Sequence, residues 1–154
     1  MIGKTPVKRE YSFRGDWFFM TKERLRNLHN YLYLRYRDEM AITFEELEDD
    51  DFGAYIQSRR IVIPNKVKNS QTEWTLFAFL HEIGHIKTNT VQMKRYEQEY
   101  LATKWALEEA KRIGFDVPAR FIKTYQDYIW RWRETSLKLK GNNVCRKEDV
   151  KLHV

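Results

Sequence analysis

The chain has 154 residues, of which 42% are hydrophobic, and this is enough apolar material for one compact core. A single cysteine, Cys145, excludes a disulfide framework and a cysteine-rich zinc module. The net charge of +6 is unevenly spread, with nine Lys or Arg residues against four acidic ones from Arg120 onward and an acidic run, EELEDDD, at 45–51. We interpret both segments as solvated surface.

Residues 1–39 comprise a lead-in and a helix. The basic start, MIGKTPVKRE, is not followed by the apolar segment of a signal peptide, and the longest apolar run of the chain, WTLFAFL, is too short to span a bilayer. We therefore expect a soluble, cytoplasmic protein without a membrane partner. Thr21 is the predicted N-cap of a helix that runs to about Arg37. Apolar side chains recur every three to four residues along one face of this helix, at Leu25, Leu28, Leu32 and Tyr36.

Residues 40–118 begin with short strands. The segment MAITFEE alternates apolar and polar residues, and AYIQSRRIVIPN supplies a second and a third strand. A turn at 57–59 joins the last two, and Pro64 ends the third. These patterns predict a small antiparallel three-stranded sheet, and the helical patterns on either side of it make the expected fold class α+β.

Three helices are predicted after the sheet. The sequence SQTE at 70–73 has the capping-box arrangement, so a helix should follow and carry WTLFAFLHEIGHI. A second helix is expected from about Gln92 to a C-terminal stop at Gly114. Residues 119–154 are predicted to form a long basic helix and a loosely held tail. Because no repeat or low-complexity linker interrupts the chain, we expect residues 1–154 to form a single domain.

The first of these helices contains LHEIGHI at residues 80–86. His81 and His85 are four residues apart, so both rings lie on one helix face and can reach one ion. In the H-E-x-x-H arrangement the two imidazoles bind zinc and Glu82 acts as general base. Packing alone does not explain these residues, because buried charge without partners is costly. Gly84, between the histidines, would let another segment approach closely.

A hydrolytic zinc site needs a third protein ligand, which we expect on the following helix. The acids there are Glu97, Glu99, Glu108 and Glu109. Small side chains share the helix face of Glu99 and would let two helices approach closely enough for a carboxylate to reach the metal. This stripe comprises Ala102, Thr103, Ala106, Ala110 and Ile113. Glu99 is therefore the predicted ligand and Glu97 the second candidate.

Three motifs follow one another in this part of the chain: RIVIP at 60–64, the HExxH helix, and EYLATKWA at 99–106. Together they resemble the ImmA/IrrE family of zinc metallopeptidases, in which an R-x-I-x-I-like strand precedes the HExxH helix and an E-x-x-A-[DN]-x-[FW]-A helix follows it. The resemblance covers about half the chain. It implies a zincin-like core with His81, His85 and Glu99 as zinc ligands and Glu82 as catalytic base. Thr103 stands where the family pattern has Asp or Asn.

The resemblance also implies that the protein is a zinc endopeptidase that cuts a specific protein partner, such as a DNA-binding transcriptional repressor. A SprT-like protease acting near DNA resembles the chain less, because the third ligand of such proteins is generally histidine. In peptidases of this build the substrate backbone commonly adds to a sheet edge, which residues 53–56 or 60–63 could supply. Tyr55, Tyr96 or His153 could stabilise the oxyanion, and the sequence does not choose among them.

A different hypothesis is a nucleic-acid-binding protein with a structural or vestigial zinc site. The stretch IWRWRETSLKLK interleaves Trp130 and Trp132 with Arg131 and Arg133, which would suit base stacking and phosphate contacts. We favour the interpretation that the tryptophans face the core and the arginines face water. Glu82 separates the two hypotheses, because a structural site has no use for a base at that position.

Overall fold

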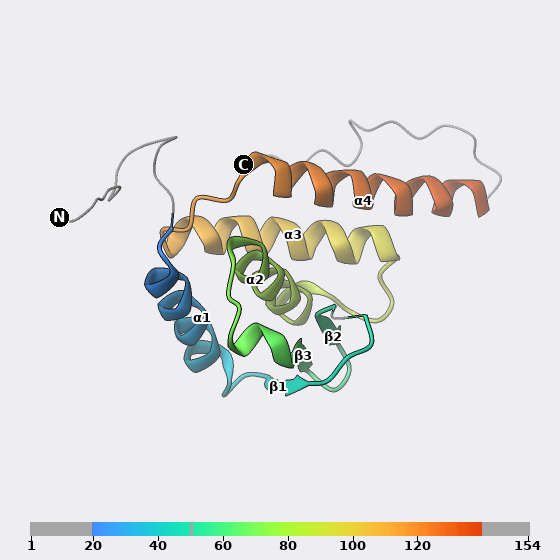
Figure 1. Ribbon diagram of the computed structural model, residues 1–154. Helices are drawn as coiled ribbons and strands as arrows, with labels where there is room; N and C mark the ends of the chain where they lie inside the picture. Colours follow the sequence, from blue (N-terminus) through green and yellow to red (C-terminus); the bar gives the residue numbers. More distant parts are fainter. Residues whose placement is uncertain (1–19, 50, 140–154) are drawn as a thin grey trace.

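The structure is a computed structural model that describes residues 20–49 and 51–139. Within these residues the chain forms four α-helices and a small sheet, which lies at the lower edge of the view with α2 above it (Figure 1), and the predicted α+β class is confirmed. The elements are α1 (Lys22–Tyr36), β1 (Ala41–Glu45), β2 (Gly53–Tyr55), β3 (Arg60–Pro64), the 3₁₀ helix η1 (Asn65–Lys68), α2 (Glu73–Thr88), α3 (Arg95–Arg112) and α4 (Ala119–Leu139). Our expectations for the lead-in before residue 20 and for the C-terminal tail lie outside the described residues.

Helix α1 begins and ends where its sequence pattern predicts. The Thr21 hydroxyl accepts a hydrogen bond from the Arg24 N–H, at 3.1 Å, and so caps the first turn. The face that carries Leu25, Leu32 and Tyr36 is buried. His29 lies on the same face and is 6% exposed, stacked on Phe79 of α2. Burial of this face attaches α1 to the core.

The sheet is mixed, so the expectation that it would be antiparallel throughout is wrong. Strands β2 and β3 form the predicted antiparallel hairpin, but β1 pairs with β3 in parallel, and the strand order is β1-β3-β2. The central strand is the most apolar, with Ile61, Val62 and Ile63 buried. A tight turn at 56–59 fixes β2 against one edge of β3. The connection from β1 to β2 is longer and does not determine the direction of β1. Strand β1 pairs with the other edge of β3, in parallel.

Helix α2 is the centre of the core and carries the predicted LHEIGHI. Its N-cap is Thr72 rather than Ser70, because Thr72 and Thr75 exchange side-chain and backbone hydrogen bonds at 3.1 and 2.8 Å. Nearly every side chain from Leu76 to Ile86 is buried. The helix packs against both the sheet and α3 (Figure 1), so its polar residues are enclosed between these elements.

Helices α3 and α4 run side by side above α2 (Figure 1). Helix α3 starts at Arg95 rather than near Gln92, and the predicted glycine stop is confirmed, since Gly114 has φ +80°. Helix α4 reaches α2 through aromatic contacts, with the ring of Phe121 4.9 Å from that of Trp74. None of the helices among the described residues is long and apolar enough to cross a membrane.

Candidate metal centre

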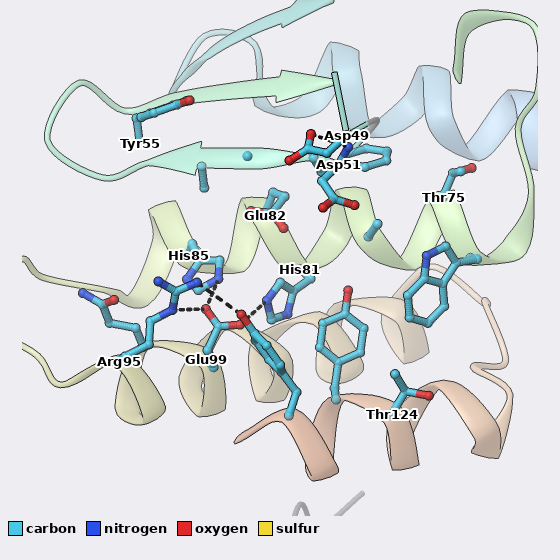
Figure 2. A pocket seen from close by; sticks show the side chains of 18 of the residues that line it. Asp49, Asp51, Tyr55, Thr75, His81, Glu82, His85, Arg95, Glu99 and Thr124 are labelled. Atoms are coloured by element: carbon cyan, nitrogen blue, oxygen red, sulfur yellow. Dashed lines mark hydrogen bonds and ion pairs between the residues drawn. The ribbon is translucent and has the colours of Figure 1, made fainter. Parts of the chain in front are cut away.

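Helix α2 presents three polar side chains to the same cleft. His81 and His85 are one helical turn apart, with ring centroids 4.6 Å from each other, and both are buried. Glu82 follows His81 directly and lines the same cleft (Figure 2). The spacing that the sequence predicts therefore places the two imidazoles on one face of the helix, while Glu82 lines the same cleft from the side of α2 nearer the sheet.

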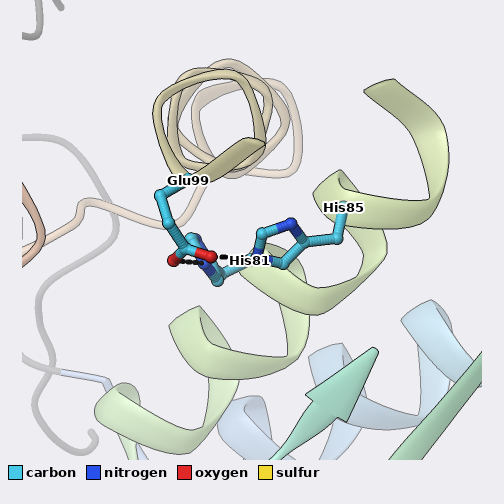
Figure 3. Close-up of side chains that lie close together, drawn as sticks. All are labelled: His81, His85 and Glu99. Carbon is cyan, nitrogen blue, oxygen red and sulfur yellow. Dashed lines mark hydrogen bonds and ion pairs between the residues drawn. The ribbon is translucent and has the colours of Figure 1, made fainter. Parts of the chain in front are cut away.

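Helix α3 supplies the predicted third side chain. Glu99 is buried and faces both imidazoles (Figure 3), with its two oxygens 3.2 Å from His81 Nε2 and 3.0 Å from His85 Nε2. One nitrogen or oxygen atom from each of the three residues lies within 4.8 Å of the others. His81, His85 and Glu99 thus form a buried group that could hold a metal ion.

Close contact between α2 and α3 brings Glu99 to the histidines. A Cβ atom on Gly84 would lie closer to the carbonyl oxygen of Ala102 than real Cβ atoms come to any neighbour, and it would also lie 3.0 Å from the Ala102 Cα. Only glycine lets the two backbones approach in this way. The small side chains predicted on the α3 face, from Ala102 to Ala110, are buried against α2.

A hydrogen bond behind His81 fixes which ring nitrogen carries its proton. The Thr103 hydroxyl donates its only hydrogen to the Glu99 carbonyl oxygen, at 2.7 Å. It therefore accepts a hydrogen bond from the Nδ1–H of His81, at 3.1 Å. This tautomer leaves the lone pair of His81 Nε2 directed toward Glu99, as a metal ligand requires.

Asn89 has the same effect on His85. The Asn89 side-chain nitrogen donates to the carbonyl oxygen of Gln98, at 3.1 Å, and to the hydroxyl of Thr88, at 3.0 Å. The amide oxygen of Asn89 is therefore the atom that faces His85 and accepts from its Nδ1–H. Both imidazoles consequently direct an unprotonated Nε2 toward Glu99.

Two nitrogen lone pairs and a carboxylate meet at this point, and such a group of acceptors needs a cation or additional protons between them. The pKa values agree with this requirement. Burial opposes ionisation of Glu99, but the hydrogen bonds and charges that the two imidazoles supply once Nε2 is protonated outweigh it and lower the pKa of Glu99. Burial likewise opposes charge on His85, yet the Glu99 hydrogen bond and the charge of Glu82 raise its pKa. The centre therefore favours added positive charge.

The cleft that contains this centre has a volume of about 1010 Å³. Its floor is α2, and its walls come from β2 with the preceding loop, the start of α3, and α4 (Figure 2). Tyr55 lies on the sheet side of the cleft, while Arg95 and Thr124 lie on the helical side. A bound chain could therefore reach the histidines from either end.

Two further groups of the cleft have altered acidity. Burial raises the pKa of Glu82, although the neighbouring histidine charges act in the opposite direction. Burial and the charges of Glu82 and Glu99 also raise the pKa of Tyr125, whose ring lies 4.5 Å from that of His81. Glu82 is thus a stronger proton acceptor than an ordinary glutamate, and the Tyr125 hydroxyl retains its proton.

The structure distinguishes among the residues that the sequence left open. Glu97 is exposed and accepts the Lys94 N–H at 3.0 Å, so it caps α3 and does not face the histidines. Tyr55 lines the cleft, and Tyr96 is absent from the lining among the described residues. His153 lies outside the described residues.

Sequence reasoning missed the contribution of α4 to the cleft. Tyr125 and Tyr128 line it, and Tyr128 accepts a hydrogen bond from Arg95 at 3.3 Å. The signal was an aromatic stripe at helical spacing, from Phe121 through these tyrosines to Trp132, but the pattern does not say which helix it packs against. Of the predicted tryptophans, Trp130 is partly buried against the core, whereas the ring of Trp132 is covered by Arg95.

Comparisons with protein-family models, with curated proteins and with solved structures found no match for this chain. The functional argument therefore depends on the residues and their geometry.

Proposed function

We propose that this protein is a zinc-dependent peptidase that hydrolyses a peptide bond in a specific protein partner. The observation that carries the proposal is the convergence of His81 Nε2, His85 Nε2 and the Glu99 carboxylate beside Glu82 in an open cleft. Two imidazoles and one carboxylate are a donor set that zinc prefers, and three protein ligands leave one position for substrate or water. Bound zinc would supply a Lewis acid and lower the pKa of water at the site.

Glu82 is the proposed general base. Among the described residues, no hydrogen bond or ion pair engages its carboxylate, and it faces the cleft beside His81. Its raised pKa suits a group that accepts a proton from the attacking water and returns it to the leaving amine. A structural metal site would have no need for such a carboxylate, so Glu82 favours the peptidase over the nucleic-acid-binding alternative.

Tyr125 is the proposed donor to the oxyanion that develops on the scissile carbonyl. Its hydroxyl has no hydrogen-bond partner among the residues of the described ranges, and its ring packs against His81. The raised pKa means that the hydroxyl remains a donor at neutral pH. A fixed donor next to the reacting carbonyl stabilises the transition state more than the ground state.

Strand β2 is the proposed docking edge for the substrate backbone. Of the two edges suggested by the sequence, 60–63 belongs to the central strand, whereas Gly53–Tyr55 is an outer strand and lines the cleft. An extended peptide could add to this edge through main-chain hydrogen bonds and pass over Glu82. The substrate would then be an exposed, extended segment of a protein. The resemblance to the ImmA/IrrE family suggests a cytoplasmic DNA-binding repressor as such a partner.

The experiment is to incubate the zinc-loaded protein with a denatured cytosolic protein extract and identify new N-termini by mass spectrometry. We expect cleavage products with the wild type and a rate at least about 100-fold lower with Glu82→Gln. Glu108→Gln, a matched change at an exposed position of α3, should retain the wild-type rate. Identical products and rates from wild type and Glu82→Gln would contradict the proposal.

A further inference from the structure

The two ends of the cleft differ in chemistry, and α4 passes along both. At one end, Trp74 of α2 contacts Phe121 and Tyr125, with ring centroids 4.9 and 5.6 Å apart. At the other end, Arg95 of α3 donates to the Tyr128 hydroxyl at 3.3 Å and lies 4.8 Å above the Trp132 ring. The histidines lie between the two ends, with Arg95 and Thr124 on opposite sides of them in Figure 2. A substrate bound along the cleft would therefore meet an aromatic end and a cationic end.

The cationic end contains two arginines, Arg95 and Arg131, and both line the cleft. Arg95 is about half exposed, and its Nε lies 3.2 Å from a Glu99 oxygen. Arg131 is exposed, and no acid among the described residues forms an ion pair with it. A cation held by the histidines and Glu99 would neutralise part of the negative charge of Glu99. Less of that charge would then remain to balance the positive charge of Arg95. This end of the cleft is therefore short of negative charge.

The position of Arg95 limits which part of a substrate it can reach. Its Nε contacts the same Glu99 oxygen that lies 3.0 Å from His85 Nε2. Arg95 and His85 thus contact the same carboxylate oxygen, so the distance between the guanidinium and the imidazole is shorter than the length of two residues of an extended chain. A group bound by Arg95 would belong to the substrate residue next to the scissile bond.

The rest of the cleft favours a single carboxylate over a nucleic-acid backbone. Four acids line it together with the two arginines and Lys66, namely Asp49, Asp51, Glu82 and Glu99. These acids would repel a chain of phosphates, whereas a peptide can place one carboxylate at the arginines and neutral groups elsewhere. The planar guanidinium of arginine also matches a carboxylate in geometry.

We propose that Arg95 and Arg131 form a subsite for a carboxylate on the substrate residue adjacent to the scissile bond. The carboxylate belongs either to an Asp or Glu side chain or to the C-terminus of the substrate. This inference rests on the proposed function, because it places the subsite relative to the metal centre. The preferred substrates would then have an Asp or Glu residue, or their own C-terminus, next to the bond that is cut.

The test measures binding of small thiol ligands to the zinc-loaded protein by calorimetry, so that it does not depend on turnover. Mercaptoacetamide reports on the metal centre alone. Mercaptoacetyl-Glu-Ala-amide and its Gln counterpart test a side-chain carboxylate, and mercaptoacetyl-Ala with its amide tests a terminal one. Variants are Arg95→Gln and Arg131→Gln, with Lys104→Gln, an exposed position of α3 outside the cleft lining, as control. Zinc content is measured for each variant, because Arg95 contacts Glu99.

We expect one carboxylate ligand to bind about tenfold more tightly than its amide partner in wild type and in Lys104→Gln. This preference should fall to about threefold or less in Arg131→Gln, which touches no proposed metal ligand, and in Arg95→Gln. Equal binding of acid and amide in both pairs would overturn the subsite, as would displacement of these ligands by a dT oligonucleotide with no acid preference. Failure of mercaptoacetamide to bind would overturn the proposed function itself.

Discussion

Gly84→Ala tests the close approach of α2 and α3 on which the metal centre depends. A Cβ atom at this position would lie 3.0 Å from Ala102 Cα and 3.1 Å from its carbonyl carbon, with the carbonyl oxygen closer still. These are backbone atoms of a helix, so they cannot rotate away as a flexible side chain would. The substitution must therefore push the two helices apart.

The size of the effect follows from these contacts. Carbon atoms pack at about 3.5–4.0 Å, so α2 and α3 must separate by roughly 0.5–1 Å. Overpacking costs about 1–3 kcal/mol, and the better helix propensity of alanine offsets up to about 1 kcal/mol of this. We expect a net loss of about 1–2 kcal/mol in the free energy of unfolding. Because ligand distances tolerate only about 0.2 Å, zinc affinity should fall by about tenfold or more.

The assays are urea unfolding of the metal-free protein and zinc affinity by competition with a chromophoric chelator. Gly53→Ala is the control, since a Cβ there would lie 3.7 Å from its nearest neighbour, the Tyr55 ring. It should change stability by less than about 0.5 kcal/mol. A Gly84→Ala protein with wild-type stability and wild-type zinc affinity would refute the reasoning.

Three other substitutions test separate parts of the account. Thr103→Val removes the acceptor for His81 Nδ1–H and should lower zinc affinity by about 10- to 100-fold, whereas Thr103→Ser should retain the wild-type affinity. Equal zinc affinities of the two variants in chelator competition would show that Thr103 does not support His81 as a ligand. Tyr125→Phe keeps the ring and removes the hydroxyl, so zinc content should be unchanged while kcat falls about 100-fold, and an unaltered kcat would exclude Tyr125 as oxyanion donor. Burial lowers the pKa of His29 from 6.5 to about 4, so the unfolded chain takes up a proton first as the pH falls. The free energy of unfolding should then drop by about 2 kcal/mol between pH 6.5 and pH 5, and His29→Gln should lose this dependence in urea titrations.

Local sequence patterns were sufficient to predict the helices and all three proposed ligands. The HExxH spacing places His81 and His85 on one face whatever surrounds the helix, and the small-residue stripe singles out Glu99 from the other acids of α3. The reason is that helical periodicity is a property of neighbouring residues, which a sequence contains directly.

Features that depend on distant parts of the chain were not predicted. The direction of β1 is set by which edge of β3 remains available, and no turn sequence specifies it. Tyr125 reaches the metal centre because α4 packs across α2, and Thr103 supports His81 only because α2 and α3 are so close. These arrangements result from tertiary packing, which the spacing of residues along one helix does not encode.

Metal content measures the central claim, that His81, His85 and Glu99 together hold a zinc ion. Wild type, Glu99→Gln and Glu97→Gln are loaded with zinc, passed through gel filtration and analysed by inductively coupled plasma mass spectrometry. We predict about one zinc per chain for wild type and for Glu97→Gln, whose exposed side chain only caps α3, and loss of most zinc from Glu99→Gln. A wild type that retains no zinc, or a Glu99→Gln variant that retains as much as wild type, would contradict the account.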